Sequence, residues 1–322
     1  MATGIVSTAA QLFDLQAFSM LLLVVGTAGY AVLIALHVGR MLTCAAAVRA
    51  DATTPGTAFG FFTFVAASDV LAVRYASAGD HGVAAALGLV GLLSWLLLTY
   101  TIPVGLMLGG SDRPLGPSVN ASWLVWVVAT QSVSTAASVL SSTGPDRALL
   151  GFVAAMFWGI GSILYLILIT IVTARMLLSA MTADEMTPPY WINMGATAIT
   201  VLAGVRLLAT PLPGQLQELL PVITAVSFMF WAFGSFWIPC LLIFGLWRYG
   251  RGGRPLTYEP ALWSIVFPLG MYATATDLFG KVARLPWLPP LAWAVSWVAF
   301  AAWAVVFAYM ARALLARPAA IS

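Results

Sequence analysis

The hydrophobic pattern divides the chain into ten apolar segments, separated by short breaks that contain Pro, Gly and charged residues. About 20 helical apolar residues cross the hydrocarbon layer of a bilayer, and all but the first segment reach that length. The pattern therefore predicts an all-α integral membrane protein with a single transmembrane domain over residues 1–322. The segments are residues 1–13, 18–41, 57–77, 83–108, 121–141, 148–178, 189–209, 219–247, 260–279 and 288–315.

The first segment is shorter than the others. Thirteen helical residues rise about 20 Å, which is less than the roughly 30 Å of hydrocarbon. Either Met1 begins inside the first transmembrane helix, or the segment is a short interfacial helix.

Odd-numbered and even-numbered segments differ in composition. The odd segments mix Gly, Ala, Ser and Thr with a few large residues, as in MATGIVSTAAQL from Met1 and INMGATAITVLA from Ile192. The even segments are rich in Leu, Ile and Val, as in SILYLILITIV from Ser162. Small and hydroxylated residues either allow close helix packing or line a wet path, whereas aliphatic residues suit lipid. The strict alternation favours five odd helices as an inner ring, surrounded by five even helices.

Hydroxyl groups on the odd segments are the candidate lining of a central path. Bends at Gly4, Gly195 and Gly270 would also expose backbone polar groups, which is tolerated where they line a cavity. No basic residue falls at the middle of an odd segment, so we expect weak, channel-like binding. The hydroxyl candidates are Thr3, Thr63, Ser68, Thr130, Ser134, Thr197, Thr200, Thr274 and Thr276.

Five ionisable residues lie toward the predicted external ends of odd segments: Asp69, Arg74, Arg206, Asp277 and Lys281. Charges inside a membrane are functional candidates, and here they would form a vestibule that draws anions inward. Asp277 and Lys281 are four residues apart and share a helix face. The alternative is that these residues form interfacial ion pairs that fix the helix ends.

Composition excludes a soluble globular protein, because 61% of the residues are hydrophobic and only 8% are charged. Cys44 and Cys240 lack metal-ligand spacing, and we expect buried free thiols. His37 and His81 have no partner ligands, and there is no H-E-x-x-H, nucleophile elbow or P-loop. We therefore expect neither an enzyme nor a cofactor.

Basic residues predict the orientation of the chain. Nine Arg residues fall on the side that holds both termini and five basic residues fall on the other, so this side should be cytoplasmic. The bias is concentrated in Arg248, Arg251 and Arg254, which serve as a positive-inside anchor or hold anionic lipid. We expect a multi-pass protein of the plasma (inner) membrane with cytoplasmic termini.

Several motifs resemble one known family. The alternation of segments occurs together with F-F-T-x-x-x-A from Phe61, P-P-Y-W-I-N-M-G from Pro188 and W-S-I-V-F-P-L-G-M-Y-A-T from Trp263. In these features the whole chain resembles the tellurite-resistance/dicarboxylate transporter family. That family includes the bacterial protein TehA, fungal malate permease, sulfite efflux pumps and plant slow anion channels.

The resemblance implies five helical hairpins around a pseudo-five-fold axis, with a pore lined by the odd helices in each subunit of a homotrimer. It implies that the Phe267 ring plugs this pore. The family's first helix has several apolar residues before a phrase like MATGIVS, so the resemblance implies a truncated first helix here. Small inorganic or organic anions are the implied cargo.

The sequence around Phe267 also suggests a gate without the family. Pro268 follows it, and a proline inside a helix removes one backbone hydrogen bond and bends the rod. A bend would turn the ring toward the axis, where a hydrophobic constriction closes a path by excluding water. The alternative is an ordinary packed Phe beside a transmembrane proline.

Two kinds of transport fit these observations. The first is an anion channel of the TehA type gated by Phe267, with a relation to tellurite resistance. The second is a proton-coupled carrier for C4-dicarboxylates, sulfite or related oxyanions, which would use Asp69 or Asp277 as its titrating group. A scaffold without a permeation path is the third reading.

Overall fold

The fold is an all-α bundle in a computed structural model that describes residues 1–109, 119–142, 146–251 and 257–316. Eight of the described segments are long and apolar enough to cross a membrane. The predicted segments agree with the observed helices to within a few residues, so the all-α membrane class is confirmed. Arg113, Arg254 and Arg317, which contributed to the predicted orientation, lie outside the described residues, and so does the side chain of Arg251.

Five inner helices form a closed ring. α1 packs on α5, α5 on α8, α8 on α10, α10 on α12, and α12 returns to α1. The five odd segments therefore form the inner ring that their alternation predicted, in the pseudo-five-fold order that the family resemblance implied. Its members are α1 (Ala2–Leu12), α5 (Phe62–Ser77), α8 (Val125–Ser141), α10 (Ile192–Leu208) and α12 (Trp263–Val282).

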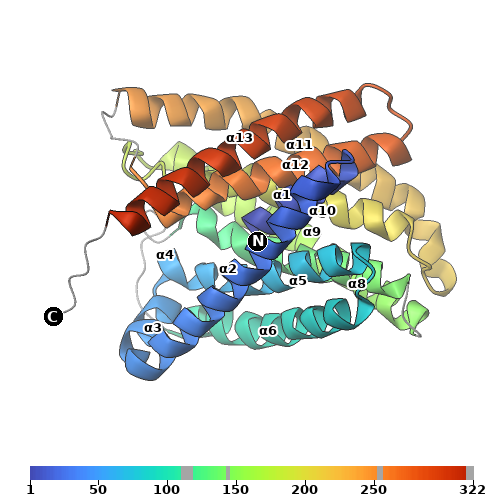
Figure 1. The fold of residues 1–322 in the computed structure, drawn as a ribbon, viewed down its shortest axis with the longest axis horizontal. Helices are drawn as coiled ribbons and strands as arrows, with labels where there is room; N and C mark the ends of the chain where they lie inside the picture. The colour runs from blue at the N-terminus through green and yellow to red at the C-terminus, as the bar shows by residue number, and fades with distance from the viewer. Residues whose placement is uncertain (110–118, 143–145, 252–256, 317–322) are drawn as a thin grey trace.

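Five outer helices complete the hairpins, because each packs on the inner helix that precedes it in the chain. Leu33, Leu97 and Ile163 on this layer are all more than 60% exposed, as expected for side chains that face lipid. Figure 1 shows α11 and α6 along opposite edges of the bundle. The outer helices are α2 (Gln16–Thr43), α6 (His81–Leu108), α9 (Arg147–Leu178), α11 (Leu220–Leu246) and α13 (Leu288–Leu315).

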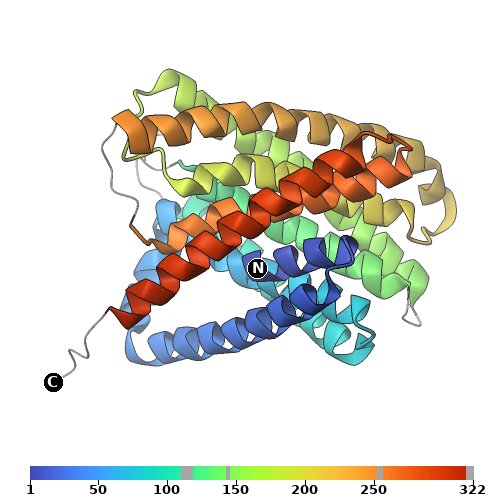
Figure 2. The same ribbon diagram turned by 45° about the horizontal axis from the view of Figure 1, so that its top comes forward.

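α1 is 11 residues long and rises only about 16 Å. Both views place the N-terminus part-way along the bundle (Figures 1 and 2), with α2 and α13 on the outside next to α1. α1 nevertheless contacts α2, α5, α12 and α13, so it is a full member of the ring and not an interfacial helix.

Short helices connect the longer ones. Four single 3-10 turns lead directly into α5, α8, α10 and α12, which is a further sign of the internal repeat. The pattern did not predict α3, a nine-residue exposed helix after α2. Cys44 lies between α2 and α3 and is exposed, so the expectation of a buried thiol was wrong there. The short elements are α3 (Ala45–Thr53), α4 (Pro55–Ala58), η1 (Phe59–Phe61), η2 (Ala121–Leu124), η3 (Pro188–Trp191), η4 (Gly214–Leu219), the π-helical η5 (Trp247–Arg251) and η6 (Pro260–Leu262).

Candidate functional site

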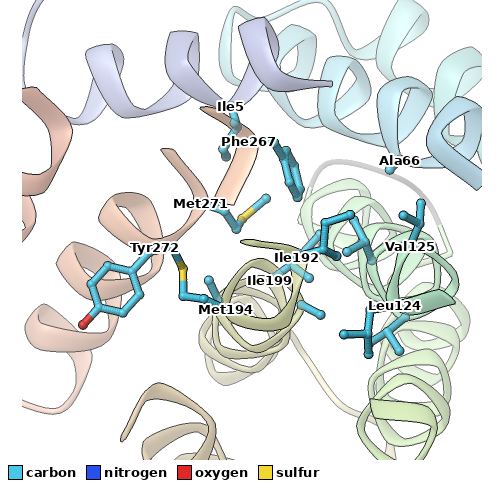
Figure 3. Packing of buried hydrophobic residues seen from close by; sticks show 14 of the residues in the cluster. Ile5, Ala66, Leu124, Val125, Ile192, Met194, Ile199, Phe267, Met271 and Tyr272 are labelled. Atoms are coloured by element: carbon cyan, nitrogen blue, oxygen red, sulfur yellow. The ribbon is translucent and has the colours of Figure 1, made fainter. Parts of the chain in front are cut away.

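Phe267 lies inside the ring and is 1% exposed. Figure 3 shows its ring, and the Met271 side chain one turn later, pointing into the space between apolar side chains of the other inner elements. Tyr272 points the opposite way, toward the outer layer, where its hydroxyl lies 2.6 Å from the Ser235 hydroxyl of α11. The apolar group around Phe267 and Met271 includes Ile5 of α1, Ala66 of α5, Val125 of α8 and Ile192 of α10.

Two glycines set the close approach of neighbouring helices beside Phe267. A Cβ atom on Gly195 of α10 would lie 2.8 Å from Pro268 Cγ, and one on Gly270 would lie 3.1 Å from Ile5 Cγ2. Pro268 lies within α12 and packs directly against α10. Gly195 and Gly270, which the sequence predicted as bends in the path, lie at close helix contacts. So does Gly4, since its Cβ would lie 2.8 Å from Val70 Cγ1.

A small cavity lies on the ring axis beyond Met271, toward the C-terminal ends of the inner helices. Its volume is about 20 Å³, room for about one water molecule, and all five inner helices contribute to its wall. Met271 lines the cavity from the Phe267 side. The polar residues in the wall are Thr8 of α1, Asp69 of α5, Ser132 and Thr135 of α8, and Arg206 of α10.

Asp69 is 1% exposed and sits where α5, α6 and α8 meet. Its Oδ2 accepts a 2.7 Å hydrogen bond from Ser132 Oγ. Its Oδ1 packs against Gly91 of α6 and has no hydrogen-bond partner among the described residues. Gly91 is needed here because a Cβ atom would collide with the carboxylate.

Arg206 borders the same cavity from α10, and its Nε has no hydrogen-bond partner in the described part of the chain. Asp69 and Arg206 are not joined by an ion pair, although both border one cavity. The sequence placed both residues in an outer vestibule. The structure brings these two together, from helices 137 residues apart.

The other three predicted vestibule charges lie away from the cavity wall. Arg74 is buried against the α1–α2 hairpin, where its Nε donates to Ser7 Oγ at 2.9 Å and its Nη2 to Ser19 Oγ at 2.7 Å. Lys281 Nζ lies 2.7 Å from Asp277 Oδ2, which is the predicted i, i+4 pair on α12. Arg74 therefore ties two hairpins together, and Asp277 is already neutralised by a partner.

The hydroxyl residues predicted to line the path mostly face the outer layer. Each inner helix shares a hydrogen bond with a Trp or Tyr side chain on the outer helix of the preceding hairpin, and this contact recurs around the whole ring. Trp303 of α13 donates to Thr3 at 3.1 Å, Tyr30 of α2 pairs with Ser68 at 2.7 Å, Trp95 of α6 donates to Thr130 at 2.8 Å, Trp158 of α9 donates to the Thr200 carbonyl at 3.1 Å, and Trp231 of α11 donates to Thr276 at 3.0 Å.

The remaining predicted hydroxyls are also satisfied away from the cavity. Ser134 donates to the Ala154 carbonyl of α9 at 2.7 Å. Thr197 packs against Gly234 of α11, where there is no room for a Cβ atom. Three others bond within their own helical segment: Thr63 to Gly60 O, Thr200 to Ala196 O and Thr274 to Gly270 O.

The sequence interpretation missed the hydroxyls that do border the cavity. Thr8, Ser132 and Thr135 are in its wall, and the last two are three residues apart on one helix face. Thr130 and Ser134, four apart, share the opposite role of facing the outer layer. The helical spacing of residues 130–135 places the Ser132–Thr135 pair and the Thr130–Ser134 pair on different faces of α8. This spacing is the sequence signal that could have identified the side facing the cavity.

Comparison with known proteins identifies the family. The model of the voltage-dependent anion channel family SLAC1 matches residues 1–311. An uncharacterized membrane protein of Mycobacterium tuberculosis is 39% identical over 153 residues, covering 48% of this chain and 78% of that protein. An uncharacterized transporter of Methanocaldococcus jannaschii is 26% identical over 189 residues, covering 58% of this chain and 53% of the relative. The chain belongs to the voltage-dependent anion channel family SLAC1, a family of membrane transporters and channels.

Proposed function

We propose that the protein conducts small anions along the axis of the inner ring and that the Phe267 ring is the gate. The observation that carries this proposal is the position of Phe267, whose side chain fills the space between all five inner elements next to an axial cavity. A constriction of apolar side chains stops ions because water leaves it. Removal of the ring would open a wet path from the cavity past Met271.

The test is reconstitution of the purified protein in planar bilayers with chloride, nitrate, malate and sulfite. We expect Phe267→Ala to raise the anion current by at least about tenfold, because truncation removes the ring that fills the constriction. The matched control is Phe279→Ala. Phe279 is on the same helix and equally buried, at 1% exposure, but it packs against Phe228 of α11. Equal currents for the two variants, or none for either, would refute the gate.

A proton-coupled carrier is the second candidate, and the buried carboxyl group of Asp69 beside the axial cavity favours it. Asp277 is a weaker candidate because Lys281 already pairs with it. A carrier would show saturable uptake driven by a pH gradient and lost in Asp69→Asn. A channel would show a current whose reversal potential follows the anion gradient and ignores the proton gradient.

We also propose an inner-membrane protein with cytoplasmic termini that assembles as a homotrimer. The orientation is supported by Arg40, Arg175, Arg248 and Arg312, which lie at or near the C-terminal ends of four outer helices. The trimer rests on the family resemblance, and light scattering of the purified protein with detergent subtracted would measure it. Tellurite resistance is tested by growth of expressing cells on tellurite.

A further inference from the structure

We propose that the axial cavity is a binding site for one small monovalent anion, held by Arg206, and that protonation of Asp69 strengthens this binding. This inference rests on the proposed anion path, and it adds the charge class of the cargo and a control of binding by pH. Its basis is the presence of one guanidinium group and one carboxyl group in the wall of the same cavity, without an ion pair between them.

Arg206 is available to a ligand. Its Nε lacks a hydrogen-bond partner among the described residues, and no acidic side chain there lies within ion-pair distance of it. A guanidinium group has five N–H donors in a planar fork and stays charged. Arg206 is half-buried, and its Nε is a buried donor of the kind that is normally satisfied by protein, water or a ligand. An anion in the cavity would supply the missing acceptor.

Asp69 sets the net charge that such an anion meets. When its carboxyl group is ionised, the cavity wall carries one positive and one negative group and is neutral overall. When Asp69 is protonated, the wall carries one net positive charge, which matches a monovalent anion. Since the Asp69 side chain is buried, at 1% exposure, its charge is weakly screened there and the difference is large.

No other titratable group in the described residues around Asp69 is placed to take this role. On its own helix, Arg74 is turned toward Ser7 and Ser19 of the α1–α2 hairpin. From α2, the Tyr30 hydroxyl is bonded to Ser68. The Tyr75 hydroxyl of α5 is bonded to Thr27 of α2, and the α-amino group of Met1, at the start of α1, is not part of the cavity wall. α1 and α8 bring no titratable side chain, and α6 carries only His81 and Tyr100, both away from Gly91. From α10 the cavity receives Arg206.

The charges of α12 complete this account. Asp277 and Lys281 form a neutral pair and are not part of the cavity wall. The Tyr272 hydroxyl of α12 is bonded to Ser235 in the outer layer. Titration of the cavity is therefore assigned to Asp69, and by linkage an anion that binds more tightly to the protonated form must draw a proton onto Asp69.

The experiment measures anion binding to the closed protein, so that it does not depend on conduction. Purified protein in detergent is titrated with sodium nitrate, sodium chloride and sodium malate at pH 5.5 and pH 8, with ionic strength held constant, and apparent dissociation constants are taken from the rise in melting temperature. We expect nitrate and chloride to bind about tenfold more tightly at the lower pH. Malate should produce a smaller rise at both values.

Three variants test the roles assigned to Asp69 and Arg206. Asp69→Asn keeps the carboxyl shape and an acceptor for Ser132, and it should bind nitrate equally at both pH values, with the affinity of the protonated wild type. Arg206→Gln should lose the nitrate-dependent rise at both. The control Asp277→Asn should retain the pH dependence of the wild type. Circular dichroism spectra and gel-filtration profiles check that each variant is folded.

The proposal is overturned by wild-type binding that is independent of pH, by pH dependence that survives in Asp69→Asn, or by nitrate binding that survives in Arg206→Gln. A malate effect as large as that of nitrate would overturn the monovalent assignment. These outcomes are separate from failure of the proposed channel. Absence of current in Phe267→Ala together with acid-dependent nitrate binding would refute the gate and leave the site in place.

Discussion

The two sides of the inner helices carry different chemistry. Toward the axis, Ile5, Ile199, Met271 and Phe267 present apolar surface, interrupted by the few polar residues of the cavity wall. Toward the outer layer, hydroxyl groups on every inner helix except α10, and a backbone carbonyl on α10, bond to Trp or Tyr side chains. The difference teaches that the small polar residues hold the two layers together, while the axis is closed by large apolar ones.

Overpacking of the layer-facing side should give the largest loss of stability. A Cβ atom on Gly161 of α9 would lie 2.6 Å from Gln131 Nε2 and 2.7 Å from its Cδ, on a residue that is fully buried. We expect Gly161→Ala to lower the free energy of unfolding by about 1–3 kcal/mol, because a packed interface must move apart. Unfolding in mixed detergent–SDS titrations, followed by tryptophan fluorescence, measures this.

The matched control is two residues away on the same helix. A Cβ atom on Gly159 meets nothing within 4 Å, so Gly159→Ala should be neutral or slightly stabilising. Equal destabilisation by the two substitutions would mean that helix α9 does not depend on close packing against α8 at Gly161.

Removal of one hydrogen bond between the layers should cost less. Trp95 Nε1 donates to Thr130 Oγ1 at 2.8 Å, and both side chains are buried. Trp95→Phe, Thr130→Val and the double variant form a cycle, in which we expect a coupling energy of about 0.5–1.5 kcal/mol. The anion current in the Phe267→Ala background should not change, because neither residue borders the cavity. A change in ion selectivity would place Thr130 on the path after all.

The sequence predicts the helices well and the two sides of each helix poorly. Segments such as 121–141 and 288–315 are located accurately because bilayer thickness fixes the length of an apolar run. The rotation of a helix about its own axis is harder, because both sides of an inner helix are buried in protein. Thr130 and Thr135 are alike in the sequence, yet one bonds Trp95 and the other borders the cavity.

The approach of Asp69 and Arg206 could not be predicted for a related reason. Asp69 lies at the middle of α5, whereas Arg206 lies near the C-terminal end of α10. Their common cavity depends on the order of helices around the ring and on Gly91, which lets α6 pack against the Asp69 carboxylate. Neither property leaves a local signal in the chain. A motif, and not a periodicity, singled out Phe267, whose role as the gate stays a proposal.

Two neighbouring residues on α10 test the difference between the axis side and the outer-layer side of an inner helix. Ile199 borders the cavity, whereas the Thr200 hydroxyl bonds Ala196 O of its own helix and the Thr200 carbonyl accepts from Trp158. In the Phe267→Ala background we expect Ile199→Thr to raise the chloride current roughly twofold, because a hydroxyl makes the wall easier to wet. Thr200→Val keeps the shape and the Trp158 bond, and it should leave the current unchanged. If the effects were reversed, with Thr200→Val lowering the current and Ile199→Thr silent, the hydroxyl side of the inner helices would be the conducting one, and the apolar side would serve packing alone.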